Sequence, residues 1–447
     1  MINFYKIPII LVVITLLNSA YLSAAENHSY DLPQAIEYAI NNNPNLQIMQ
    51  ERIAQAETQV GIALSSFYPN ISTSLSYEYT DNPSRAFGMI IAQRRLDFSP
   101  SVDFNHPGGT DNYRPEVTAS YSLFRGGQDY FQTKAAQLGV EAAKLEKSVI
   151  RNQLLNSVSS TFYVYLASIA ADEVALRSIK AVESELKQSR IRYEAGAILR
   201  SDVLSLEVQL AQVQGDKIQT ANAIELAKTG LKQLLGITAS QPFEINTSNH
   251  WVLPEASHSF DELLNVAFKQ RPEIYTANKQ IEIAQQQLNV ARGAYLPTAD
   301  AYVSYGSDSK NLEFSSSQDN ITAGVMVKMD IFSGFRDNEK LKKAEHQLAI
   351  AKKSAKQTQL IIESSVKSAH LKILEALARY KVTSSAVKAA AEALRLVKEQ
   401  RKAGTVTVTR YIEAEVARDK SSARNIAARF DALRAEAELK QAIGTWK

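Results

Sequence analysis

The sequence contains no cysteine. It therefore has neither a disulfide framework nor a thiolate metal site, and no thiol near the N-terminus can accept a lipid anchor. Histidine is nearly as scarce, and no two of the six residues have the i, i+4 spacing of a helical metal site. We expect no metal and no cofactor.

Patterns of enzyme chemistry are missing as well. No Ser/His/Asp arrangement or paired-carboxylate motif stands out, and Gly126-Gly127 lacks the GxGxxG or Walker pattern of a phosphate-binding loop. His106, beside Asp103, is a candidate metal ligand, although a solvent loop is the ordinary interpretation of such a segment. We predict that the protein is not an enzyme.

Long apolar runs are absent after Glu26, which argues against a membrane protein built from transmembrane helices. Residues 1–25 instead resemble a secretory signal. Lys6 is their only charge, Ile7–Leu17 form a short apolar core, and Ser23-Ala24-Ala25 offer a small-residue cleavage site. We expect export and cleavage, with an uncleaved anchor as the alternative.

The charges nearly balance, with 50 Lys and Arg against 47 Asp and Glu. Loss of residues 1–25 removes one Lys and no acid, so the mature chain also stays near neutral. Such a balance selects neither nucleic acid nor an anionic membrane surface as a partner. We expect no nucleic-acid partner.

An internal duplication organises the rest of the chain. Each copy has a proline-initiated segment, at Asn43-Pro44 and at Arg271-Pro272. Three later motifs recur at one constant offset, which chance matches rarely produce. The pairs are Phe124-Arg125-Gly126 with Phe332-Ser333-Gly334, Ala195-Gly196 with Ala403-Gly404, and Leu231–Gly236 with Leu439–Gly444. We predict a first repeat over 26–236, a linker over 237–258 and a second repeat over 259–447. The first copy carries an extra loop between Pro69 and Phe124.

Four segments alternate with a period of two, at about 70–80, 113–124, 298–306 and 320–332. In the first, Ile71, Leu75 and Tyr79 share one face, and serines occupy the other. Length and pattern are typical of bilayer-spanning strands around an aqueous lumen, and a periplasmic β-sandwich edge is the alternative. Four strands cannot close a barrel, so strands in a membrane would require oligomerisation.

Two tracts, 128–193 and 336–401, have the composition and spacing of long coiled-coil helices. At about 1.5 Å per residue, each would extend for roughly 100 Å. The shorter helices 45–67 and 200–236 together match one long helix in length. We therefore expect two shorter helices stacked end to end beside each long one, with tight turns at Gly196 and Gly404.

This duplicated order of helices, strands and glycine turns resembles the TolC family of outer-membrane channel-tunnel proteins over essentially the whole mature chain. The resemblance implies a mainly α-helical α+β fold. Its duplicated coiled-coil hairpins would form a periplasmic α-barrel, and four membrane strands per protomer would contribute to a 12-stranded β-barrel in a homotrimer. Short helices at 31–42 and 259–269 would form a belt.

The implied function is a passive, gated exit channel of a tripartite efflux or type I secretion system. Its implied partners are a periplasmic adaptor (membrane fusion) protein, an inner-membrane transporter of the RND, MFS or ABC class, and outer-membrane lipid. Adaptor hairpins would dock near the two turns, at Ala195-Gly196-Ala197 and Ala403-Gly404-Thr405. The alternative is a non-conducting periplasmic coiled-coil scaffold or adaptor.

The resemblance also implies a ring of aspartates just beyond the second turn, where this chain has Arg410 and Glu413. Asp202 matches the family residue that ties the closed tip together. We hypothesise that these three side chains, with Arg401 and Tyr193 one turn before the glycines, hold the gate closed. For Arg410 the alternative is an ordinary solvated helix face.

Overall fold

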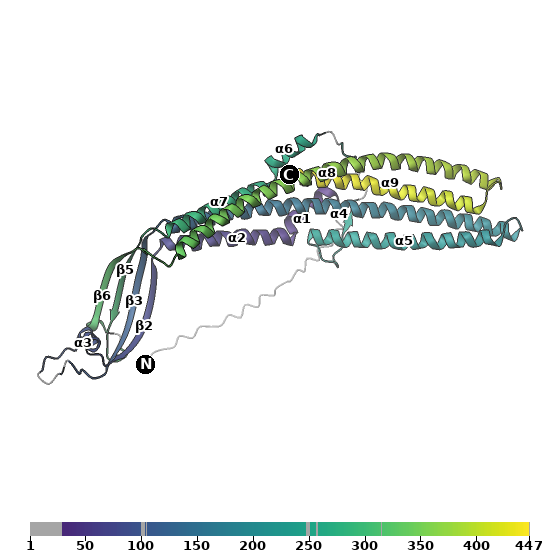
Figure 1. The fold of residues 1–447 in the computed structure, drawn as a ribbon. Helices are drawn as coiled ribbons and strands as arrows, with labels where there is room; N and C mark the ends of the chain where they lie inside the picture. Colours follow the sequence, from purple (N-terminus) through teal and green to yellow (C-terminus); the bar gives the residue numbers. More distant parts are fainter. Residues whose placement is uncertain are drawn as a thin grey trace, which may run out of the picture.

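The computed structural model describes residues 29–99, 103, 105–246, 251–255, 258–313 and 315–446. The predicted signal peptide and parts of the predicted linker lie outside these residues. The molecule is elongated, with a four-stranded sheet at one end and long helices at the other (Figure 1). The helices are α1 Leu32–Asn42, α2 Pro44–Leu64, α3 Pro83–Ala92, α4 Gln128–Glu194, α5 Arg200–Leu235, α6 Phe260–Gln270, α7 Pro272–Gly293, α8 Arg336–Lys402 and α9 Val408–Ile443, with 3-10 turns η1 Ser65–Phe67 and η2 Ser316–Gln318.

The long helices α4 and α8 both have 67 residues, and α5 and α9 both have 36. Each pair occupies the tracts in which the sequence predicts matching helices. Helix α4 packs against α2 and α5, and α8 packs against α7 and α9. Two shorter helices thus accompany each long one, as the helix lengths predict.

The end-to-end junctions are held by specific contacts. The Asn43 side chain caps α2 and also donates its Nδ2 to the carbonyl of Leu234, at 2.7 Å, in the last turn of α5. In the second copy the Arg271 side chain does not cap α7, but its Nη1 donates to the carbonyl of Ala442 in α9, at 3.4 Å. Each copy therefore begins and ends at one point on the side of the bundle.

Gly236 fits this junction for two reasons. Its φ of 74° lies in the left-handed region, and a Cβ there would lie 2.5 Å from the carbonyl oxygen of Asn42. Gly196 has a similar φ of 75°, but a Cβ added to it would meet only open space.

We expect Gly196→Ala to cost about 1–2 kcal/mol of stability through backbone strain alone. Gly236→Ala should cost clearly more, because the junction must also move apart. Thermal unfolding of the two variants in detergent measures the difference. Equal losses would show that the close approach at Gly236 contributes nothing.

The middle of α4 lies in the largest apolar core. Val158 and Phe162 are fully buried there against α1, α5 and α9. Among the described residues, α4 alone is long and apolar enough to cross a membrane by length and composition, which is weak evidence. Of its most apolar stretch, 44% is buried inside the bundle. The short parallel strands β1 Ser29–Tyr30 and β4 Glu244–Ile245 flank this core.

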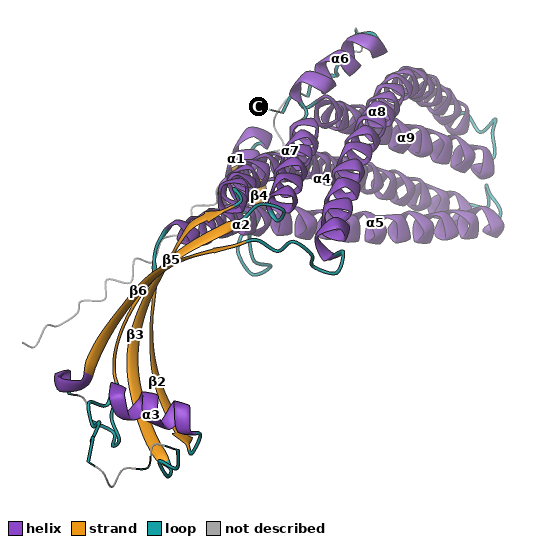
Figure 2. Cartoon of the chain, turned by 60° about the vertical axis from the view of Figure 1, so that its left-hand side comes forward, coloured by secondary structure: helices purple, strands orange, loops and turns teal. Residues whose placement is uncertain are grey.

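The four long strands form one antiparallel sheet in the order β2-β3-β5-β6 (Figure 2). Their bounds are β2 Asn70–Thr80, β3 Thr110–Arg125, β5 Thr298–Ser307 and β6 Asp319–Lys328. The last strand ends before the predicted residue 332. Its neighbour β5 begins at Thr298, opposite Lys328, so later residues have no strand to pair with.

The extra segment of the first copy holds a helix that the sequence analysis missed. Asn82 caps α3 by accepting a hydrogen bond from the Arg85 amide, and Pro83 takes the first helical position. The segment is therefore not only a loop. Figure 2 shows α3 lying across the strands near their far end.

Candidate functional sites: the strand sheet and the helical tip

One face of the sheet is apolar across all four strands. The strand register aligns Thr73 with Val117, Val117 with Tyr305, and Tyr305 with Ile321, and the neighbouring rows repeat this pattern. Most of these side chains are exposed, and Ile321 has 72% of its surface open. A contiguous exposed apolar surface of this kind marks a membrane or protein contact.

The opposite face is polar along the same strands. One row aligns Ser72, Thr118, Ser304 and Thr322. Nearer the far end, Asp308 is buried and accepts hydrogen bonds from Arg114 at 2.6 Å and from two asparagine side chains. The alternation that the sequence predicts is thus one continuous two-sided sheet, apolar on one side and hydrophilic on the other.

The outer strands β2 and β6 have no strand on their free sides within the described residues. Unpaired backbone groups are not tolerated in hydrocarbon, because each costs several kcal/mol. A sheet with this apolar face can enter a bilayer only when further strands cover both edges.

The other end of the molecule has two tight helix-to-helix turns. Gly196 and Gly404 adopt φ of 75° and 76°, and the amides of Ala197 and Thr405 bond back to carbonyls five residues earlier. Both are C-terminal glycine caps. Ala195 and Ala403 precede these glycines, and all six turn residues lie at the surface.

Arg401 is buried, with only 8% of its side chain exposed. Its Nε lies 3.1 Å from Oε1 of Glu185 on α4, and its carbonyl accepts from Arg192, also on α4, at 3.4 Å. The last turn of α8 is therefore fastened to the last turns of α4. Arg401 is one of the residues that the sequence predicts for the gate, but the sequence does not predict its partner Glu185.

Arg410 lies on an exposed surface and pairs with Glu413 at 3.2 Å. Tyr193 is also exposed, and Asp202 is half-buried in the first turn of α5. Within the described part of this chain, no hydrogen bond or ion pair joins Asp202 to Arg410 or Arg401. The five predicted gate residues thus share one end of the molecule without forming a single cluster in one protomer.

A buried ionic cluster further along α9 was not predicted. Glu415 is fully buried, pairs with Arg418, and lies 3.4 Å from Nζ of Lys398 on α8. Burial, and then the negative charge of Glu415, raise the pKa of Tyr411. A signal was available, because Val408, Tyr411, Glu415 and Arg418 recur every three or four residues, so the last two occupy core-facing positions.

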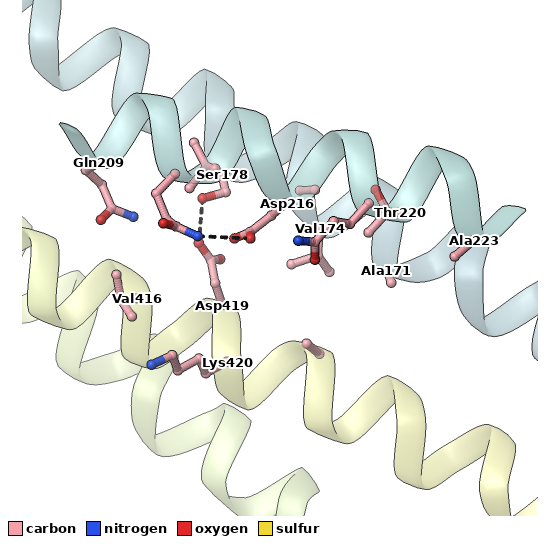
Figure 3. A pocket seen from close by; sticks show the side chains of 15 residues that line it. Ala171, Val174, Ser178, Gln209, Asp216, Thr220, Ala223, Val416, Asp419 and Lys420 are labelled. Carbon is pink, nitrogen blue, oxygen red and sulfur yellow. Dashed lines mark hydrogen bonds between the residues drawn. The ribbon is translucent and has the colours of Figure 1, made fainter. Parts of the chain in front are cut away.

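Beside this cluster, α4, α5 and α9 enclose a cavity of about 630 Å³ (Figure 3). Asp419 lines it and accepts a 2.6 Å hydrogen bond from the Ser178 hydroxyl. Burial raises the pKa of Asp419, against the opposing effects of Ser178 and Arg418. The ionised carboxylate is therefore disfavoured by the fold.

This shift predicts the sign of a pH effect. A raised folded-state pKa means that stability is greatest below the ordinary aspartate pKa and is lost as the pH rises through the folded value. We expect Asp419→Asn to raise the Tm at pH 7, with the gain vanishing near pH 4. Thermal unfolding of both proteins across this range tests it, and a destabilised variant at pH 7 contradicts the assignment.

The metal candidate lies apart from these surfaces. His106 Nδ1 is 2.9 Å from Asp103 Oδ2, and both side chains are exposed. Among the described residues, no group of three or more His, Cys, Asp or Glu side chains could hold a metal ion.

An apolar-faced strand sheet joined to long paired helices defines a membrane channel-tunnel architecture. The outer membrane efflux protein family matches this chain over residues 35–237 and 263–445, and the chain belongs to that family. The resemblance inferred from the sequence is confirmed.

Similar proteins agree in class. The chain is 23% identical to Protein CyaE of Bordetella pertussis, covering 79% of this chain and 71% of that protein. It is 21% identical to the outer membrane protein TolC of Escherichia coli, covering 98% and 86%. A crystal structure of a membrane protein from Pseudomonas aeruginosa superposes with a TM-score of 0.79 at 19% identity, covering 92% of this chain and 90% of that one.

The protein is therefore an outer-membrane channel of the efflux and secretion type, as predicted. The alternative of a non-conducting periplasmic scaffold is not favoured. The family is one of transport proteins, in line with the expectation that this chain is not an enzyme.

Proposed function

We propose that three copies of this chain assemble into one conduit, with the four strands of each contributing to a 12-stranded barrel in the outer membrane. The supporting observation is the continuous apolar face of a sheet whose two edges are unpaired. Placing β6 of one protomer beside β2 of the next covers every edge. The polar face then lines an aqueous lumen.

The helices continue this conduit through the periplasm. Exposed apolar side chains lie along α5, at Val208 and Leu226, and along α8, at Ile350 and Leu360. In the half of the bundle away from the sheet, α5 and α8 lie along opposite sides in Figure 1. Neighbouring protomers would bury them, as the seams of a closed α-barrel require.

The tip forms the gate. Arg401 and Glu185 hold the hairpin of α8 and α9 against α4. The exposed Arg410–Glu413 pair and Asp202 remain available to neighbouring protomers. Tyr193 is exposed at the same end. Opening would separate the two hairpins at this contact.

The surfaces around Gly196 and Gly404 would receive a periplasmic adaptor, which links the channel to an inner-membrane transporter. Relatives serve different cargoes, since one is a pyoverdine export protein and another an alkaline protease secretion protein. We infer that substrate choice resides in the transporter. The conduit itself is passive.

Conductance and assembly test this function together. Purified protein should migrate as a trimer in mild detergent and form discrete channels in planar bilayers. Release from membranes by salt or alkali without detergent, or a monomer without conductance, would contradict it.

A further inference from the structure

Helix α3 lies on the polar face of the sheet. Arg85 of the helix forms an ion pair with Glu78 on β2. The Gln93 Nε2, just after the helix, donates to Oδ1 of Asn112 on β3 at 2.9 Å. Glu78 and Asn112 are direct cross-strand partners. Both contacts therefore fix the same side of the sheet, opposite Tyr77 and Tyr79.

The helix and the residues after it span the whole sheet. Past its C-terminal end, the Arg94 Nη2 donates to the carbonyl of Asp319 on β6 at 2.9 Å. Ten helical residues cover about 15 Å, and three strand spacings of about 4.8 Å cover nearly the same distance. This segment thus reaches from the first strand of the sheet to the last.

The attachment is specific. Ala86, Met89 and Gln93 are buried against the strands, and Gln93 is fully enclosed. A groove of about 840 Å³ remains between helix and strands, with Gly88, Arg114 and Asp308 among its lining residues. A loosely tethered loop would show neither buried apolar contacts nor a buried amide with two acceptors.

We propose that α3 constricts the outer mouth of the channel from inside the lumen, an inference that rests on the proposed trimeric barrel. Twelve strands about 4.8 Å apart and tilted by about 40° enclose a cylinder roughly 24 Å across. A helix with its side chains is about 10 Å thick. Three copies, each on the polar wall, would leave little open space.

The mouth is thus narrowed by the first copy alone. The second copy has the short segment 308–318 in place of the insertion, and the described residues of this segment form no helix longer than the single turn η2. The constriction is built from three helices with charged anchors at both ends. Solutes leaving the tunnel would pass between them.

Two variants test this proposal by single-channel recording. In one, a short Gly-Ser linker replaces residues 83–95, which removes α3 and keeps β2 and β3. Both variants are made in the Arg401→Ala protein, so that the closed tip does not limit the current. We then expect loss of α3 to raise the conductance roughly twofold or more, because the lumen of about 24 Å loses three helices. In the other, Gly88→Cys gives the cysteine-free protein one thiol on α3. A water-soluble methanethiosulfonate should then reduce its conductance.

The control is Thr73→Cys, on the apolar face of β2, where the same reagent should have no effect. Channels of unchanged conductance after loss of α3, and insensitivity of the Gly88→Cys channel to the reagent, would overturn the proposal and leave the channel function intact. If the deletion variant fails to fold, the Gly88→Cys recording decides alone. Absence of any channel in the wild type would overturn both proposals.

Discussion

Val325→Arg is expected to abolish stable assembly in the outer membrane. Val325 lies on the apolar face of β6, with 66% of its surface exposed, and pairs with Ala301 on β5. An arginine facing lipid near the middle of a barrel strand costs about 2–4 kcal/mol, and a trimer carries this cost three times. The yield of detergent-extracted trimer should fall to a small fraction of the wild type.

Met326→Arg is the matched control, one residue further along the same strand. Its side chain is also exposed, but it lies on the polar face beside Asp300. This cation would face the lumen and should permit assembly. If both variants reduced the trimer yield equally, the two faces of the sheet would not differ in their contact with lipid and water. The proposed orientation of the barrel wall would then be wrong.

Arg401→Ala is expected to destabilise the closed tip by about 3–5 kcal/mol, because it leaves Glu185 buried without its partner. The two side chains are 8% and 13% exposed. The variant should show larger or more frequent openings in planar bilayers. Combining it with Glu185→Gln should recover part of the loss, since the orphaned charge is removed.

The control lies on the same helix, where Arg395 pairs with Glu392 and both side chains are more than half exposed. Exposed pairs of this kind contribute little, so Arg395→Ala should leave both stability and conductance unchanged. A wild-type conductance for Arg401→Ala, with its stability reduced, would show that the pair supports the fold without controlling the gate.

Periodicity in the sequence predicted most of the fold. Alternation identified all four strands, and the matching offsets placed Gly196 and Gly404 at equivalent turns. Periodicity failed after Lys328, where the alternation continues in the sequence but no residue of a neighbouring strand is left to pair with. It also failed in the insertion, where α3 has no counterpart in the second copy for comparison.

The contacts at the helical tip were harder to predict from the sequence. The partner of Arg401 is Glu185, which lies 216 residues earlier in another helix. The hydrophobic periodicity of a helix shows which face is buried. It does not show how two helices are aligned along their axes. Buried Glu415 and half-buried Arg418 were not predicted for a related reason, because charged residues on long helices are usually solvated.

The junctions of α5 with α2 and of α9 with α7 bear on how such a protein could arise. Each copy leaves one point on the side of the bundle, passes through the sheet and the tip, and returns to the same point, where Gly236 meets Asn42 and Gly444 meets Arg271. A unit whose ends coincide can be copied in tandem with only a short connection. A connection such as the predicted linker 237–258 then joins the two units, and neither one is rearranged.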